Sequence, residues 1–234
     1  MIVSIHQPAY LPWLGYFDRL VASDAHVVLD HVQFEKNSFI NRNKIRTRQG
    51  WGWLTLPIRT AGRFGDLPIN QVEIANETPW ASKHWTALRM NYGKSPFFPE
   101  HADFFRTIYE RRWNKLVDLT REITDYVVEA FRITTPRYFS SELNVGGKKD
   151  ELVLNICRQL GAKVYLSGPM GRNYLREEMF QDAGIAIRYH DYSHPTYPQT
   201  YPGFEPYMAA VDLLFNMGKR SLETLSPSRE LIAR

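Results

Sequence analysis

The sequence predicts an α/β fold, in which a parallel, Rossmann-like sheet core carries a β-hairpin and a helical insertion. Two β-branched runs, at 1–5 and 25–30, flank a stretch whose apolar residues recur at helical spacing. This strand–helix–strand order is a βαβ unit, which places its two strands parallel with a right-handed crossover. Similar runs at 163–167 and 185–190 predict two more strands, so both ends of the chain build the sheet.

The middle of the chain has two other patterns. Short strand-like pieces, punctuated by glycines, follow the first βαβ unit at 32–34, 39–40, 53–58 and 72–74, which is typical of antiparallel hairpins. Apolar residues at helical spacing come next, most clearly from Leu116 to Phe131. We therefore expect one α/β domain over 1–225, made of a sheet core (1–30 and 150–190), a β-hairpin region (31–75) and a helical insertion (79–140), followed by a tail (226–234).

Composition limits the classes of function. The chain has 234 residues, 44% of them hydrophobic, and a formal net charge of +4, a mild basic excess that suits an anionic ligand. Its single cysteine, Cys157, excludes an internal disulfide, and the apolar residues around it indicate a buried thiol rather than a nucleophile. The histidines lack zinc-type spacing, so we expect no metal. No signal peptide or membrane-length apolar run is visible, so we expect a cytoplasmic protein without a membrane span.

Polar residues follow the predicted parallel strands. Open parallel sheets bind ligands outside the carboxyl ends of their strands, so His6, Asp30, Ser167-Gly168 and His190 are expected to converge there. His6 is suited to act as a general base near neutral pH, and the alternative is a hydrogen-bonded turn histidine. The aromatic residues of the loop after the first strand would form a wall of the site, or partly belong to the core.

Three further stretches carry candidate binding groups. On a strand, alternation puts the amides of Asn41 and Asn43 on one face and the cations of Arg42 and Lys44 on the other. One of these faces meets a polar ligand, or both are simply solvated. His84 lies on a predicted helix. It is expected either to bind a ligand or to be an ordinary surface histidine. The glycine-containing loop at 167–174 can hold a phosphate or carboxylate, although it lacks the Gly-Lys-Ser/Thr element of a P-loop.

The candidate site residues fall into two groups. The predicted catalytic residues are His6, Gln7 and Asn43, and the predicted substrate-binding residues are Tyr10, Trp13, Gly15, Tyr16, Asn41, Arg42, Lys44, Lys83, His84, Ser167, Gly168, Arg172, Tyr174, His190 and Gln199.

Several stretches together resemble the WbqC-like protein family: 5–16 (IHQPAYLPWLGY), 41–45 (NRNKI), 53–57 (WLTLP), 165–168 (YLSG), 197–199 (YPQ) and 212–216 (DLLFN). The first of these motifs is the most specific. The resemblance implies a cytoplasmic bacterial protein of O-antigen or other amino-sugar pathways, which transfers glycine or another acyl group to a sugar amine.

The first βαβ unit is also similar, more distantly, to the nucleotidyltransferases with a His-x-Gly-His signature. Trp13 and Tyr16 stand where that signature has its two histidines, and Gly15 keeps its glycine. The loop at 167–174 takes the place of the second phosphate-binding loop of that superfamily. This similarity implies a nucleotide-like pocket.

The leading interpretation is an acyl- or aminoacyltransferase that N-acylates an amino sugar or a similar amine. His6 would deprotonate the amine, Gln7 or Asn43 would stabilise the oxyanion, and Arg42, Lys44 and Arg172 would hold phosphates. The alternatives are an ATP-dependent adenylate-forming ligase or nucleotidyltransferase-like enzyme, and a non-catalytic subunit that binds a carrier or ligand.

The sequence requires no cofactor. The acyl donor would be a thioester of coenzyme A or of an acyl carrier protein. Alternatively, the protein would use ATP. A sugar nucleotide or another amine-bearing small molecule is the expected partner. A nucleic acid is not expected, with tRNA left open as an aminoacyl donor.

Overall fold

The computed structural model describes residues 1–60, 62–63 and 65–226, so the predicted tail lies outside the described residues from 227 onward. The chain forms two compact units. The sheet unit consists of Met1–Pro8, Gly15–His31 and Thr134–Ser193, and the helical unit of Ala9–Leu14, Val32–Ile133 and the chain from His194 on. That the two form one domain stays a prediction.

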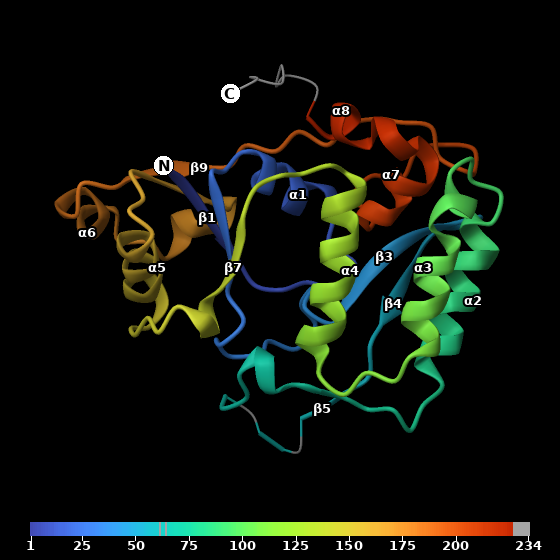
Figure 1. Ribbon diagram of the computed structural model, residues 1–234, viewed down its shortest axis with the longest axis horizontal. Coiled ribbons are helices and arrows are strands. Elements are labelled where there is room, and N and C mark those ends of the chain that lie inside the picture. Colours follow the sequence, from blue (N-terminus) through green and yellow to red (C-terminus); the bar gives the residue numbers. More distant parts are fainter. Residues whose placement is uncertain (61, 64, 227–234) are drawn as a thin grey trace. The chain divides into compact units, whose positions relative to one another are not determined.

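A parallel sheet is the frame of the sheet unit (Figure 1). Its strands are β1 (Ile2–His6), β2 (Ala25–Val28), β7 (Arg137–Phe139), β8 (Val164–Ser167) and β9 (Ala186–Tyr189), in the order β7-β2-β1-β8-β9. Every neighbouring pair is parallel. Counted along the chain this is the order 3-2-1-4-5, which confirms the predicted Rossmann-like core.

The strand β7 is the difference from the sequence prediction, which gave four strands and placed residues 137–139 in the helical insertion. It pairs with β2 in the register His26↔Arg137 to Val28↔Phe139. Only three residues long and without a β-branched residue, it has too little pattern to be recognised locally. Its pairing with β2 makes it a strand.

Helices connect the strands of the sheet unit. They are α1 (Leu14–Val21), α5 (Lys149–Gln159) and α6 (Glu177–Asp182), with 3₁₀ turns at Ser140–Glu142 and Pro169–Asn173. In α1 the apolar residues Phe17 and Leu20 recur at helical spacing and are fully buried. Cys157 on α5 is fully buried, and burial raises its pKa to about 12, which agrees with the predicted inert thiol.

The helical unit joins two antiparallel strand pairs to a group of helices. The pairs are β3 (Arg42–Thr47) with β4 (Gly50–Thr55) and β5 (Ile58–Arg59) with β6 (Glu73–Ile74), and the helices are α2 (Trp80–Tyr92), α3 (Phe98–Glu110), α4 (Leu116–Ala130), α7 (Ala210–Met217) and α8 (Ser221–Leu225), with 3₁₀ turns at Ile69–Gln71 and Gly218–Arg220. The predicted hairpin is therefore present. The strand-like pieces at 32–34 and 39–40 are not strands.

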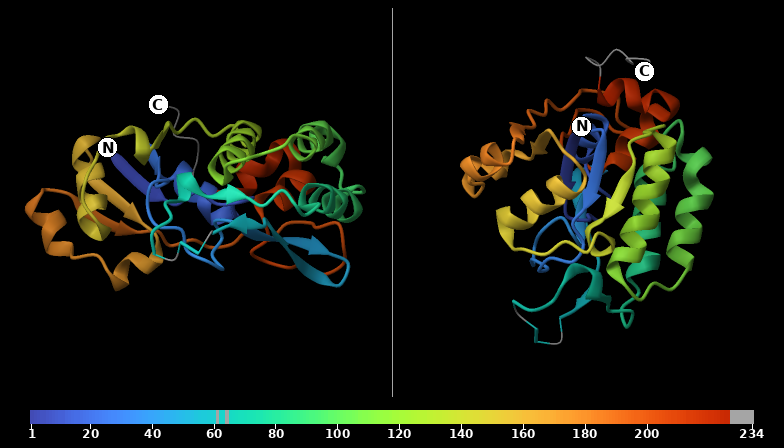
Figure 2. Two further views of the ribbon diagram at one scale, coloured as in Figure 1. Left: turned by 90° about the horizontal axis from the view of Figure 1, so that it is seen from below. Right: turned by 60° about the vertical axis from the view of Figure 1, so that its left-hand side comes forward.

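The core of the helical unit is aromatic. The ring of Phe215 on α7 lies 5.1 to 5.4 Å, between centroids, from the rings of Tyr92, Phe98 and Phe105. These rings come from α2 and α3, which run side by side in both views of Figure 2. Such edge-to-face contacts add to the stabilisation from burial. In the described part of the chain, every helix is too short or too polar to cross a membrane.

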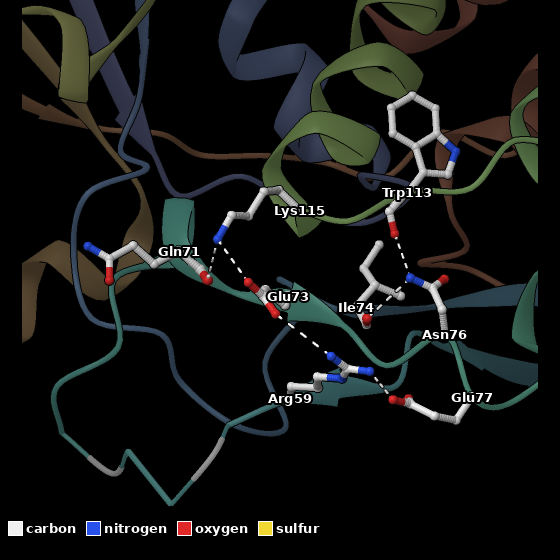
Figure 3. A network of polar contacts seen from close by, with 8 residues as sticks. All are labelled: Arg59, Gln71, Glu73, Ile74, Asn76, Glu77, Trp113 and Lys115. Carbon is white, nitrogen blue, oxygen red and sulfur yellow. Dashed lines mark hydrogen bonds and ion pairs between the residues drawn. The ribbon is translucent and has the colours of Figure 1, made fainter.

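A polar network ties the β5–β6 pair to the start of α4 (Figure 3). The carboxamide Nδ2 of Asn76 donates to the carbonyl oxygens of Trp113, at 2.8 Å, and of Ile74, at 3.3 Å. Glu73 forms ion pairs with Lys115, at 3.4 Å, and with Arg59, at 4.0 Å. The ion pairs are exposed, so solvent screening makes them weak, whereas the Asn76 contacts are partly buried.

Removing Asn76 is expected to cost more stability than removing the charge of Glu73. Asn76→Ala leaves the Trp113 carbonyl without its donor and should lower the free energy of unfolding by about 1–2 kcal/mol. Glu73→Gln, the matched control, should change it by less than about 0.5 kcal/mol. Urea unfolding followed by circular dichroism measures both, and equal effects would contradict this ranking.

Candidate functional site

The order of the strands reverses between β1 and β8, which makes this the switch point of the sheet. His6 ends β1 and is followed by Gln7, while Ser167 ends β8 and is followed by Gly168. Ligands of open parallel sheets bind outside the carboxyl ends of the strands at such a point. The structure thus places four of the predicted site residues at the edge where a ligand is expected.

His6 is held as a neutral imidazole. Its Nδ1 donates to the carbonyl oxygen of Gln7 at 2.7 Å, which leaves the ring lone pair on Nε2. The ring stands edge-on to that of Tyr16, 5.4 Å away between centroids. Burial, and then the nearby positive charge of Arg19, lower the pKa of His6 to about 3. His6 is therefore uncharged at neutral pH, and without ligand it is a weaker base than the histidine of near-neutral pKa that the sequence predicts.

The Gln7 carboxamide is available for a ligand. Gln7 is partly exposed, and its side chain makes no hydrogen bond to any residue that the structure describes. Its backbone carbonyl is the group that fixes the orientation of His6. The residue thus orients its neighbour and presents a free amide.

A buried polar layer lies beneath α1. Ser4 and His26 are paired across β1 and β2, and Ser4 Oγ lies 2.8 Å from His26 Nδ1. The Tyr16 ring of α1 stands edge-on to His26 at 5.3 Å. Burial, and then the charge of Arg19, lower the pKa of His26 well below its ordinary value. The Ser4–His26 pair is therefore polar but uncharged.

Arg19 on α1 is the residue of this site that sequence reasoning missed. It is 5% exposed, forms no ion pair with any described residue, and its Nε has no hydrogen-bond partner among them. A Cβ at Gly168 would lie 2.6 Å from Arg19 Nη1, so the glycine allows the guanidinium to approach the loop. The one available signal was its position three residues after Tyr16, on the same helix face.

The loop after β8 packs closely on the end of its strand. A Cβ at Gly171 would come within 2.0 Å of Ser167 Oγ, so the glycine lets the 3₁₀ turn lie against this hydroxyl without displacing it. Ser167 Oγ donates to the Gly168 carbonyl at 3.0 Å. The Arg172 guanidinium lies over the ring of Tyr189, 4.0 Å from its centroid. The half-exposed Tyr174 follows the turn.

The other strand ends are tied by hydrogen bonds. His190, after β9, has its Nε2 2.6 Å from the Asp18 carboxylate of α1, and its backbone N–H donates to the Ser167 carbonyl at 2.8 Å. Asp30, after β2, accepts from Ser140 Oγ at 2.9 Å and from Ser141 Oγ at 2.6 Å. Asp30 therefore holds the loop after β7.

The predicted site residues are divided between the two units. The sheet unit holds His6, Gln7, Gly15, Tyr16, Ser167, Gly168, Arg172, Tyr174 and His190, and the helical unit holds Tyr10, Trp13, Asn41, Arg42, Asn43, Lys44, Lys83, His84 and Gln199. Each group is therefore described within its own unit.

His84 belongs to a buried hydrogen-bonded chain rather than to the surface. The Tyr10 hydroxyl lies 2.8 Å from His84 Nδ1 and 2.6 Å from the Tyr109 hydroxyl. Burial lowers the pKa of His84 to about 4, although a hydrogen bond with the backbone of Thr55 opposes the shift. The neighbouring Lys83 is exposed. The contacts of His84 explain how α2 is held in the core.

The alternation predicted for residues 41–44 is confirmed, but the amide face binds backbone. Asn41 Nδ2 donates to the Leu56 carbonyl at 2.9 Å. Asn43, which is fully buried, donates to the Leu11 carbonyl at 2.5 Å and accepts from the Lys44 N–H at 2.8 Å. A catalytic role for Asn43 stays a prediction.

Cations and exposed indoles share the opposite face of this hairpin. The Arg42 guanidinium lies 4.5 Å from the Trp53 ring centroid, and the Lys44 ammonium 4.3 Å from that of Trp51. The ring of Phe39 extends this group of aromatic residues to Trp13, since the ring centroids of Phe39 and Trp13 are 5.1 Å apart. These cation–π contacts partly cover the indoles.

Gln199 lines an open cavity of about 690 Å³ in the helical unit. The cations Arg48 and Lys94 also line it. Gln199 Nε2 donates to the buried carboxylate of Asp212 at 2.8 Å, and burial raises the pKa of that carboxyl. Among the residues described, no group of three or more His, Cys, Asp and Glu side chains is placed to hold a metal ion.

The parallel sheet, with its switch point between β1 and β8, defines a Rossmann-like α/β protein. The chain belongs to the WbqC-like protein family, whose model matches residues 7–224. It is similar to the uncharacterized protein Rv1507c of Mycobacterium tuberculosis, with 36% identity over 230 residues that cover 97% of this chain and 99% of that protein. No solved structure matches the chain.

The buried neutral histidines predict a loss of stability in acid. Because the pKa of His84 is about 4 in the folded chain and about 6.5 when unfolded, the unfolded chain binds more protons between these values. Stability from His84 is thus complete above pH 6.5 and falls by about 1.4 kcal/mol per pH unit down to pH 4.

Urea unfolding between pH 7 and pH 4 tests this expectation. His84→Gln should be less stable than the wild type at pH 7, and the difference should shrink by roughly 3 kcal/mol by pH 4. A difference that stays constant over this range would show that His84 titrates normally.

Proposed function

We propose that the protein is an acyl- or aminoacyltransferase that N-acylates an amino sugar or a similar amine. The reaction would serve O-antigen or related polysaccharide biosynthesis in the bacterial cytoplasm. Membership of the WbqC-like family and a polar switch point in a parallel sheet support this proposal. The donor is a thioester of coenzyme A or of an acyl carrier protein, and the acceptor is carried on a sugar nucleotide.

The observation that carries the proposal is the position and orientation of His6. The Gln7 carbonyl fixes the imidazole, and a pKa of about 3 keeps it neutral at physiological pH. A general base must be unprotonated and oriented, and it is most efficient when its pKa lies near the operating pH. His6 meets the first two conditions at the edge of the sheet where ligands bind, and the proposal requires its pKa to rise when the substrate is bound.

The chemistry follows from these two residues. The amine nitrogen attacks the acyl carbon, a C–N bond forms, and the C–S bond of the thioester breaks. His6 Nε2 accepts the proton that the amine nitrogen loses and returns it to the leaving thiolate. The free carboxamide of Gln7 donates to the oxyanion of the tetrahedral intermediate. Arg172, Tyr174 and His190 of the sheet unit orient the substrates.

Acyl transfer by the purified chain tests the proposal. Acetyl-coenzyme A or glycyl-coenzyme A is incubated with UDP-glucosamine, and mass spectrometry follows the N-acylated product. His6→Gln should lower kcat/KM by about a hundredfold or more, because general-base catalysis typically contributes that much.

His101→Gln is the matched control, since this half-buried histidine of α3 bonds to the Tyr126 hydroxyl and has no proposed role. It should retain wild-type kcat/KM. His6→Gln activity within a few-fold of the wild type would eliminate His6 as the base.

A second candidate is an ATP-dependent, adenylate-forming ligase. The strand order and the glycine loop after β8 favour it, because nucleotides bind at such switch points. Release of pyrophosphate from ATP in the presence of free glycine would support the ligase over the transferase. A chain that transfers no acyl group but co-purifies with a carrier would instead be a binding subunit.

A further inference from the structure

The guanidinium of Arg19 is a buried positive charge without a counter-charge. It is 5% exposed, and no carboxylate of the described residues pairs with it. The groups that act on it electrostatically are the phenols of Tyr165, Tyr16 and Tyr174, and none of them is a carboxylate. Burying an unpaired ion is strongly unfavourable. The fold therefore holds a charge that its own residues leave uncompensated.

Hydroxyl groups gather beside this charge. Tyr165 and Ser167 lie on β8 and Tyr174 follows the turn after it, and each of Ser167 and Tyr174 interacts with the Tyr165 hydroxyl closely enough to act on a phenol pKa. Gly168 brings the loop backbone against Arg19 Nη1, where any side chain would collide with it. A cation with a fixed fork of donors and several O–H groups is the combination that recognises a tetrahedral oxyanion.

We propose that Arg19, Gly168 and the hydroxyls of Ser167 and Tyr174 form an anion site at the switch point, which takes a phosphate or pyrophosphate group of the substrate. The role of this anion site in catalysis rests on the proposed function. The site adds to that function that the substrate bears a phosphate or pyrophosphate group. The sequence assigned this task to Arg172, Arg42 and Lys44. Those assignments stay predictions, and the anion site adds Arg19 to them.

A bound anion would also act on the base. Arg19 is one of the causes that lower the pKa of His6. Neutralising its charge removes that cause, so His6 becomes a stronger base when the phosphate group is in place. The site thus links substrate binding to proton transfer.

Binding of pyrophosphate and of inorganic phosphate to the whole chain tests the site without turnover. Isothermal titration and thermal melting are run at constant ionic strength, with chloride as the reference anion. The wild type should bind pyrophosphate and melt at a higher temperature in its presence. Arg19→Met should bind at least tenfold more weakly.

The stability of the unliganded variant distinguishes a ligand site from a structural role. Arg19→Met removes an uncompensated buried charge, so without ligand it should melt at or above the wild-type temperature. Arg158→Met, on the exposed surface of α5, removes the same charge and should leave binding unchanged. Arg19→Lys keeps the charge without the fork, and Gly168→Ala displaces the guanidinium. If Arg19→Met fails to fold, these two variants test the site in its place, and both should bind pyrophosphate more weakly than the wild type.

Wild-type affinity for pyrophosphate in Arg19→Met, or no binding of either probe to the wild type, would overturn the inference. Acetate that binds as tightly as phosphate would overturn the assignment to phosphate. Pyrophosphate binding without any acyl transfer would contradict the proposed function alone. Acyl transfer with an unchanged KM for UDP-glucosamine in Arg19→Met would contradict the anion site alone.

Discussion

The pairing of β1 with β2 on one side and with β8 on the other is the constraint on which the rest of the sheet unit depends. It fixes the switch point, and with it the edge where His6 and Ser167 end their strands. It also places Ser4 beside His26, which creates the polar layer under α1. Arg19 can remain buried because this layer and the loop after β8 surround it with neutral polar groups.

Most of the fold could be predicted from sequence, because its elements have strong local patterns. The βαβ unit at the start of the chain and the apolar runs of β8 and β9 identify a parallel sheet without any contact information. The strand β7 could not be predicted, since three residues carry no periodicity and only the partner β2 makes them a strand. Residues 32–34 are the opposite case: their composition is typical of a strand, but no strand in the described part of the chain pairs with them to form a ladder.

The candidate site was predictable where it follows from topology. His6, Gln7, Ser167 and Gly168 end neighbouring strands, and the rule for parallel sheets places them at one edge. Arg19 was not predictable, because a charged residue in an amphipathic helix normally faces solvent. Asn43 shows the opposite case: its amide in a polar run suggests a ligand, but the group is used by the Leu11 carbonyl. The roles of the predicted residues in binding and catalysis stay predictions.

The long excursion of the chain between β2 and β7 has a consequence for how the protein folds. These neighbouring strands end at residue 28 and begin at residue 137, and most of the helical unit is synthesised between them. Closing so large a loop costs chain entropy before any pairing stabilises it. During synthesis the helices α2 to α4 emerge while β1 and β2 still lack their outer neighbours. Folding of the sheet therefore has to wait until β9 (Ala186–Tyr189) has been synthesised. Until then the open edges of β1 and β2 are the surfaces most prone to aggregation.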